Sequence, residues 1–167
     1  GFPAVFQDSR KLIATDSHFG NANVDSRKTN ENLKNWKLEN QIYVVTGFIA
    51  KDKNDDTTTL GRGGSDYTAA ILGSGLKADE IQIWTDVDGF LTADPRLVKN
   101  AFSQSELSYQ EAMEMSYFGA KVIYPPTMIP AIESQIPIYI KNTFKPESQG
   151  TLIHQKSEIS KGLIKGI

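Results

Sequence analysis

The sequence contains no cysteine and only two histidines, His18 and His154, among its 167 residues. The absence of cysteine excludes disulfides, thiolate metal sites and a cysteine nucleophile. A histidine-based zinc site or a Ser–His–Asp triad would have to use one of two histidines that lie far apart in the chain. We therefore expect chemistry that depends on neither residue type.

Long apolar runs and an excess of positive charge are also missing. No run approaches the ~20 apolar residues of a membrane-spanning helix, and no signal-peptide pattern opens the sequence. Lysine and arginine number 18 against 20 aspartates and glutamates, which gives a net charge of −2, whereas nucleic-acid binders usually show a basic excess. We expect a cytoplasmic protein with no membrane or nucleic-acid partner.

The length of the sequence suits one domain or most of one. The first residue is not methionine, and Ser160–Ile167 alternates glycine, isoleucine and lysine like the start of a further strand. We therefore expect a segment of a longer polypeptide.

Hydrophobic runs alternate with polar and glycine-rich breaks in the manner of an α/β protein. Strands are expected at Gln41–Ala50, Glu80–Thr85 and Ile136–Asn142, with a short edge strand at Thr151–Ile153. Helices are expected over Asp25–Trp36, Ser65–Leu76 and Ser108–Phe118, and in a short proline-flanked segment ending near Ser134. The helix from Ser108 has a capping box with Glu111 and a stop at Gly119, and Val5–Ala14 is expected to hold a short strand and a turn of helix.

The most informative stretch is Thr57–Tyr67, TTTLGRGGSDY, which leads into an alanine-rich helix. Its glycines permit backbone conformations and close approaches that side chains forbid, and Ser65 or Asp66 is placed to cap the first helical turn. Because the helix N-terminus is electropositive and Arg62 adds a planar donor fork, the loop suits a phosphate or a carboxylate. The alternative is an ordinary glycine-rich connection, and neither the P-loop nor the dinucleotide fingerprint is present.

A second polar stretch is Trp84–Arg96, WTDVDGFLTADPR. Asp86, Asp88 and Asp94 follow the expected strand, at the carboxyl edge where open α/β sheets bind ligands. Mg²⁺ prefers oxygen ligands and keeps several waters, so one or two carboxylates are enough to place it. The alternative is that these acids form turns and caps, and no residue is assigned as a dedicated metal ligand.

A third stretch, Tyr117–Pro126, places Lys121 just after a glycine in an apolar setting. A lysine there is able to neutralise a phosphate. The alternative is a surface lysine whose stem lies along apolar neighbours. The residues alone leave both interpretations open.

Together these stretches resemble aspartate kinase, within the amino-acid kinase superfamily. The resemblance runs from about Asp8 to Ile153, through the ordered blocks GFIA, TTTLGRGGSDYTA, WTDVDGFLTADPR, LSYQEAMEMSYFGAKVIYP and IPIYIKNTFKPESQGTLI. It implies a three-layer αβα sandwich around a mainly parallel sheet, truncated at the N-terminal side. Residues 1–153 would be the nucleotide-binding portion of the catalytic domain, and residues 154–167 a linker or the start of a regulatory ACT region.

The resemblance also implies an activity: ATP-dependent phosphorylation of the β-carboxylate of L-aspartate, with Mg²⁺, as the entry to lysine, threonine and methionine biosynthesis. L-Aspartate and ATP would be the partners, and the full-length protein would form a homo-oligomer. The implied acceptor residues are Arg62, Gly63, Gly64, Ser65 and Asp66, with Arg62 and Ser65 on the α-carboxylate and Asp66 near the ammonium group or the metal. The implied nucleotide residues are Thr85, Asp86, Leu91, Thr92, Asp94, Arg96, Lys121 and Val122, and the implied catalytic residues are Asp66 and Lys121.

The sequence departs from the family pattern at several points. It lacks the family's N-terminal Lys-Phe-Gly-Gly segment and the earlier Thr and Glu that contact aspartate, and Leu91 stands where many relatives carry tyrosine. We therefore expect little or no kinase activity from this chain alone, although the acceptor and nucleotide residues are expected to converge on one cleft. The alternatives are another kinase of the superfamily, acting on glutamate, acetylglutamate, carbamate or UMP, and a non-catalytic nucleotide-binding module. Whether a homoserine dehydrogenase domain follows stays open.

Overall fold

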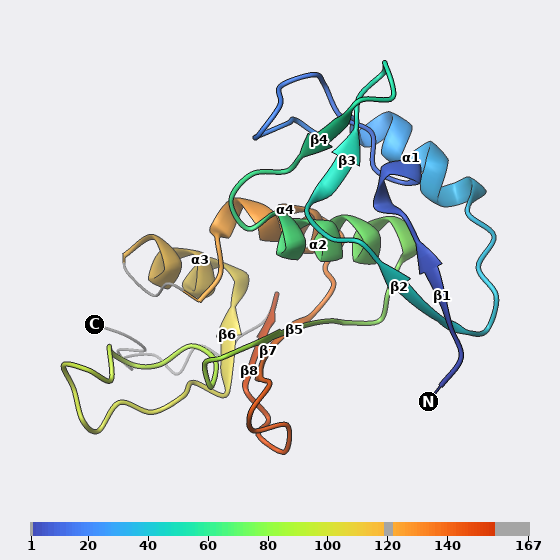
Figure 1. The fold of residues 1–167 in the computed structure, drawn as a ribbon. Helices are drawn as coiled ribbons and strands as arrows, with labels where there is room; N and C mark the ends of the chain where they lie inside the picture. Colours follow the sequence, from blue (N-terminus) through green and yellow to red (C-terminus); the bar gives the residue numbers. More distant parts are fainter. Residues whose placement is uncertain (1, 119–121, 156–167) are drawn as a thin grey trace. The chain divides into compact units, whose positions relative to one another are not determined.

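The computed structural model describes residues 2–118 and 122–155 (Figure 1). Lys121, the expected helix stop at Gly119, and most of the segment 154–167 lie outside the described residues. The chain divides into two compact units, Gly1–Leu76 and Lys77–Ile167. The expected assignment of residues 1–153 to one catalytic-domain portion stays a prediction.

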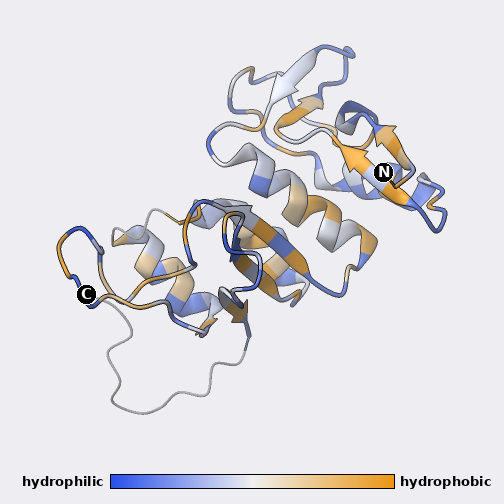
Figure 2. Cartoon of the chain, turned by 60° about the horizontal axis from the view of Figure 1, so that its bottom comes forward, coloured by the Kyte–Doolittle hydropathy of each residue, from blue (hydrophilic) through white to orange (hydrophobic). Residues whose placement is uncertain are grey.

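The first unit combines two pairs of strands with two helices. Its elements are β1 (Ala4–Gln7), η1 (Ser9–Lys11), α1 (Ser26–Asn35), β2 (Ile42–Val45), β3 (Ile49–Lys51), β4 (Thr57–Thr59) and α2 (Gly64–Leu76). Strands β1 and β2 are parallel, whereas β3 and β4 form an antiparallel pair. The strand nearest the N-terminus is strongly apolar, and the surrounding loops are mostly hydrophilic (Figure 2). The core of the unit is made of Leu12, Ile13, Leu33, Ala50, Leu60 and Ile71.

Helix α1 shows how local sequence starts an element in this unit. The carboxylate of Asp25 accepts a hydrogen bond from the Lys28 amide at 2.9 Å, which satisfies one of the free donors of the first turn. The helix is polar on most of its surface but buries Leu33, and Trp36 packs against the same core where the helix ends. The helix predicted over Asp25–Trp36 is confirmed.

The second unit contains a mixed sheet in the order β5-β7-β8-β6. Its elements are β5 (Ile81–Thr85), β6 (Glu106–Ser108), α3 (Tyr109–Tyr117), η2 (Pro125–Met128), α4 (Ile129–Glu133), β7 (Ile138–Asn142) and β8 (Thr151–His154). Strands β5 and β7 are parallel, as are β6 and β8, while β7 and β8 are antiparallel. Buried and partly buried side chains alternate along β7, and the buried ones include Ile138 and Ile140. Phe90 is fully buried as well.

The capping box predicted for α3 is present. The Ser108 hydroxyl accepts from the Glu111 amide at 3.2 Å, and the Glu111 carboxylate accepts from the Ser108 amide at 2.7 Å. Since both partners lie within four residues, the sequence alone was enough to place this helix start.

Two strand predictions are wrong, and two short strands were not predicted. The run 41–50 is not one strand, because Phe48 adopts a φ of +74° and separates β2 from β3. The short strands β4 and β6 were not predicted. The strand expected at the sheet edge, β8, lies between β7 and β6 instead.

Across residues 2–118 and 122–155, every helix is too short or too polar to cross a lipid bilayer.

Candidate functional site

The glycine-rich loop turns directly into α2. Gly61 and Gly63 have φ values of +73° and +68°, a region that favours glycine, and the Gly64 amide donates to the Gly61 carbonyl at 3.0 Å. Helix α2 begins at Gly64, so Ser65 and Asp66 lie inside its first turn. The prediction that one of them caps the helix is therefore wrong, and their side chains stand beside free first-turn amides instead.

The loop after β2 packs closely against this helix start. A methyl group built on Gly47 would lie 3.3 Å from Cα of Ser65, and one built on Gly64 would lie 2.7 Å from Cδ2 of Phe48. The Thr68 hydroxyl donates to the Gly64 carbonyl at 2.8 Å and accepts from the Phe48 amide at 3.0 Å. The absence of side chains at 47 and 64 therefore allows backbone to approach backbone.

Asp66 has an unusual environment for a carboxylate. It is half-buried, and burial raises its pKa above the ordinary aspartate value. In the part of the chain that the structure describes, its carboxylate has no hydrogen-bond or ion-pair partner. Arg62 and Ser65, which the sequence predicted as its neighbours in function, are exposed at the same end of α2. This end of the helix therefore offers a cation, a carboxylate and free amides to a small ligand.

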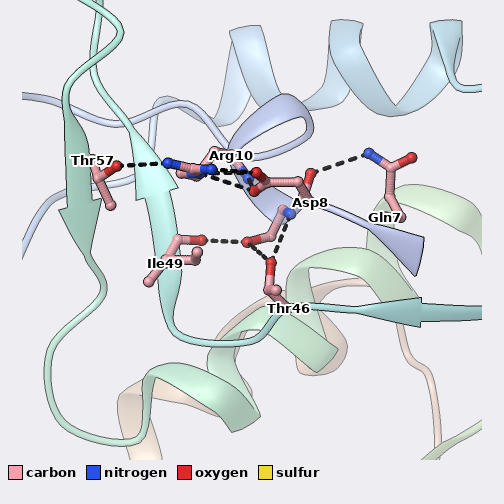
Figure 3. A network of polar contacts seen from close by, with 7 residues as sticks. Gln7, Asp8, Arg10, Thr46, Ile49 and Thr57 are labelled. Carbon is pink, nitrogen blue, oxygen red and sulfur yellow. Dashed lines mark hydrogen bonds and ion pairs between the residues drawn. The ribbon is translucent and has the colours of Figure 1, made fainter.

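Behind the 46–49 loop lies a polar network (Figure 3). The fully buried Ser9 donates its hydroxyl to the Ile49 carbonyl at 2.6 Å, and its amide donates to the Thr46 hydroxyl at 2.9 Å. Beside it, the hydrogen bonds from Arg10 hold the pKa of Asp8 below its usual range, and Arg10 also reaches the Thr57 hydroxyl at 3.0 Å. Ser9, which follows β1, is thus hydrogen-bonded to residues at both ends of the 46–49 loop.

In the second unit, the acidic turn after β5 is largely engaged with its own fold. Asp88 accepts from Asn142 at 2.5 Å and from the Lys145 ammonium at 2.7 Å, and these hydrogen bonds, Lys145 first, lower its pKa. Asp86 is exposed and accepts from the Thr85 hydroxyl at 3.2 Å. Asp88 therefore stabilises the turn after β7 through these hydrogen bonds, whereas Asp86 is exposed to solvent.

Residues 90–105, which follow this turn, form a loop that contains no helix or strand. Asp94 accepts from the amide and the guanidinium of Arg96, whose side chain is 85% exposed. The Thr92 hydroxyl accepts from the Phe102 amide at 3.2 Å, and Leu91 forms a bridge with Ser103. Asp94 thus forms a turn with its neighbours, as the alternative interpretation of the acids expected. Val122 is half-buried in a turn.

No group of three or more histidines, aspartates or glutamates gathers within residues 2–118 and 122–155. A magnesium ion would therefore find one or two carboxylates here and take its remaining ligands from phosphate and water, which is its usual habit. Asp86 fits that requirement better than Asp88, because the oxygens of Asp88 already bind Asn142 and Lys145.

The residues predicted to bind the acceptor lie in the first unit, and the described residues predicted to bind the nucleotide lie in the second. The convergence of both sets on one cleft stays a prediction. Sequence reasoning missed the side chains that hold the 46–49 turn against the start of α2: Ser9, Thr46, Phe48 and Thr68. No local pattern marks them, because their partners lie 20 to 40 residues away.

Comparison with known proteins identifies the family of this chain. The profile of the Amino acid kinase family matches residues 1–142. The chain belongs to the amino acid kinase family. Its members share the fold that the sequence predicted, and this fold class is confirmed.

Within this family the chain is similar to aspartokinases. A bifunctional aspartokinase/homoserine dehydrogenase of Buchnera aphidicola subsp. Acyrthosiphon pisum (strain APS) is 43% identical over 164 residues, covering 98% of this chain and 20% of the relative. The crystal structure of E. coli aspartokinase III in complex with aspartate and ADP has a TM-score of 0.88 and 41% identity, covering 95% of this chain and 36% of that one. The Clostridium acetobutylicum aspartate kinase structure has a TM-score of 0.84 and 40% identity, covering 98% of this chain and 36% of that one. The resemblance stated from the sequence is confirmed, and the chain spans about a fifth to a third of the length of these relatives.

Proposed function

We propose that this chain is part of an aspartate kinase, which transfers the γ-phosphoryl group of ATP to the β-carboxylate of L-aspartate. A bond forms between a carboxylate oxygen and the γ-phosphorus, the bond from that phosphorus to the β,γ-bridging oxygen breaks, and ADP leaves. The main support is the close likeness to an aspartokinase solved with aspartate and ADP. On its own we expect the 167-residue chain to turn over little or no substrate.

In this proposal the start of α2 binds the amino-acid end of the acceptor. Arg62 and Ser65 hold the α-carboxylate through charge-assisted hydrogen bonds, and Gly63 and Gly64, which have no side chains, let it approach the backbone closely. The partner-free carboxylate of Asp66 faces the substrate ammonium, which supplies the counter-charge that Asp66 lacks. Asp66 thereby contacts the substrate and orients it for phosphoryl transfer, which is its catalytic role in this proposal.

The nucleotide is assigned to the second unit. Thr85, Asp86 and Val122 would contact it, and Lys121 would neutralise phosphate charge, because phosphoryl transfer needs positioning and charge stabilisation more than covalent help. Further contacts are assigned to Leu91, Thr92, Asp94 and Arg96. When bound, Mg²⁺ neutralises the charge of the phosphate oxygens. The proposal extends to a cytoplasmic, homo-oligomeric parent enzyme of lysine and threonine biosynthesis.

The test is a titration of the ¹⁵N-labelled 167-residue chain, followed by amide shifts at residues 61–67. L-Aspartate should shift these amides, whereas glutamate, acetylglutamate, carbamate and UMP should not. Arg62→Lys keeps the charge but loses the planar fork, and should weaken aspartate binding by about tenfold. Arg27→Lys, on the exposed surface of α1, is the matched control.

Two results would count against this assignment. A glutamate or UMP response in place of the aspartate response would favour another kinase of the superfamily. A coupled assay that finds normal aspartate-dependent ATP turnover by the chain alone would overturn the expectation that it is incomplete.

A further inference from the structure

Phe48 occupies a backbone conformation that aromatic residues rarely adopt. Its φ is +74°, in the left-handed region that favours glycine. The Ile49 amide donates to the Gly47 carbonyl at 2.9 Å, which closes a three-residue γ-turn with Phe48 at its centre. A γ-turn with positive φ is strained and rare, and such strain persists only where the surroundings enforce it.

Hydrogen bonds with η1, with α2 and with the segment between β4 and α2 enforce this turn. The Phe48 amide donates to the Thr68 hydroxyl of α2 at 3.0 Å, and the Leu60 amide donates to the Phe48 carbonyl at 2.9 Å. The Ile49 carbonyl accepts from the buried Ser9 hydroxyl at 2.6 Å. The Phe48 amide, the Phe48 carbonyl and the Ile49 carbonyl therefore each have a hydrogen-bond partner outside the turn.

The ring of Phe48 packs closely against Gly64 at the start of α2. Its Cδ2 atom lies where a side chain of Gly64 would begin, 2.7 Å from a methyl group built on that glycine. The ring is 43% exposed and covers the first residue of α2. The ring thus links the turn to the helix start by direct packing.

We propose that Phe48 is a positioning residue for the acceptor site, acting through its turn rather than by touching the reacting atoms. The turn places the Gly47 backbone against Ser65, since a methyl group on Gly47 would lie 3.3 Å from both Cα and Cβ of Ser65. It thereby fixes the first-turn amides and the Ser65 hydroxyl. This inference rests on the proposed function, in which those groups bind the α-carboxylate of the substrate.

The test compares two truncations that affect strain differently. Phe48→Ala keeps the strained backbone and loses the ring, whereas Phe48→Gly loses the ring and relieves the strain. Phe48→Gly should therefore be the more stable of the two in urea unfolding. Both should nevertheless weaken aspartate binding, by about tenfold to a hundredfold, because both release the helix start.

Phe48→Tyr should keep wild-type binding, because it retains the aromatic ring in this partly exposed position. Phe19→Ala, which removes an exposed aromatic side chain elsewhere in the same unit, is the matched control and should leave affinity and stability unchanged. If Phe48→Ala does not fold, Phe48→Leu takes its place, since leucine keeps apolar contact without the ring. Wild-type affinity in both Phe48→Gly and the alanine or leucine variant would overturn the proposal.

A second readout needs no ligand. Amide hydrogen exchange at Gly64 and Tyr67, whose amides donate to the Gly61 and Gly63 carbonyls, should speed up at least tenfold in Phe48→Gly relative to wild type. Unchanged exchange would overturn the positioning role whatever the ligand. If exchange changes as expected but aspartate does not bind the wild-type chain, the proposed function fails while the positioning of the helix start stands.

Discussion

Asp66 combines two opposing influences on a single carboxylate. Its place in the first turn of α2 favours negative charge, while burial disfavours it and raises the pKa. Functional residues often keep such an environment because binding, rather than folding, supplies the compensating charge.

Asp66→Asn should therefore stabilise the folded chain at neutral pH. A carboxyl whose pKa is raised on folding stabilises most at low pH, and that contribution is lost as the pH rises through the folded pKa. At pH 7 the variant should gain about 0.5 kcal/mol or more in free energy of unfolding, and the difference should vanish below the unfolded aspartate pKa of about 3.9.

Urea unfolding at both pH values measures this gain, with the exposed Asp79→Asn as a control. In the titration with L-aspartate the same variant should bind more weakly. A variant that is less stable than wild type at pH 7 would contradict the argument.

Single residues also differ in whether the sequence was able to predict their part in this region. Arg62, Ser65 and Asp66 were predicted as site residues because glycines, a cation and a helix start are adjacent in the chain. Phe48 was missed because a positive φ at a phenylalanine is imposed by Thr68 and Ser9, through contacts that no local pattern records.

At the scale of elements, the turn after β5 is fixed by one close approach. Gly89 has a φ of +110°, and a methyl group built on it would lie 2.3 Å from the Thr151 hydroxyl and 3.0 Å from the Thr151 amide nitrogen. The next residue, Phe90, donates its amide to that hydroxyl at 2.9 Å. The turn that carries Asp86 is thus anchored to the start of β8.

Gly89→Ala should destabilise the second unit by about 2–4 kcal/mol, because backbone strain and overpacking add at this position. Fluorescence of Trp84, recorded in a Trp36→Phe background, follows unfolding of this unit. Gly20→Ala is the matched control, since Gly20 also has a positive φ of +90° but no atom within 4 Å of the built methyl group. Equal losses at the two glycines would show that crowding against Thr151 has no effect.

The sequence predicted the longer helices and strands better than the shortest strands. Helix α2 and strands β5 and β7 were expected because an apolar pattern extends over five or more residues, and α3 was expected from its capping box. Strands β4 and β6 have three residues each, too few for a pattern, and they exist because β3 and β8 pair with them.

At the scale of the whole molecule, acidic side chains in both units depend on hydrogen bonds made only in the fold. The pKa values of Asp8, Asp16, Asp52 and Asp88 are lowered in this way, Asp52 first by its bond from the Ser17 hydroxyl at 2.6 Å. A lowered folded pKa adds stability that is present above the unfolded pKa and lost as the pH falls through the folded value.

The free energy of unfolding should therefore fall steeply once the pH drops below about 4. Urea midpoints measured from pH 7 to pH 3 test this, and Ser17→Ala should lose part of the acid dependence because it removes the main partner of Asp52. Asp66 contributes with the opposite sign and makes the slope shallower. A chain that gains stability on acidification would refute the assignment of these four carboxylates.

The inner place of β8 sets a limit on how far this chain can be shortened. In the part of the chain that the structure describes, β6 reaches the sheet only through residues 151–154, and α3 starts directly where β6 ends. The segment matched by the family profile stops at residue 142, before that strand begins. A polypeptide trimmed to the family boundary would therefore release β6 and the helix that follows it, and the shortest version that retains this sheet has to extend through His154.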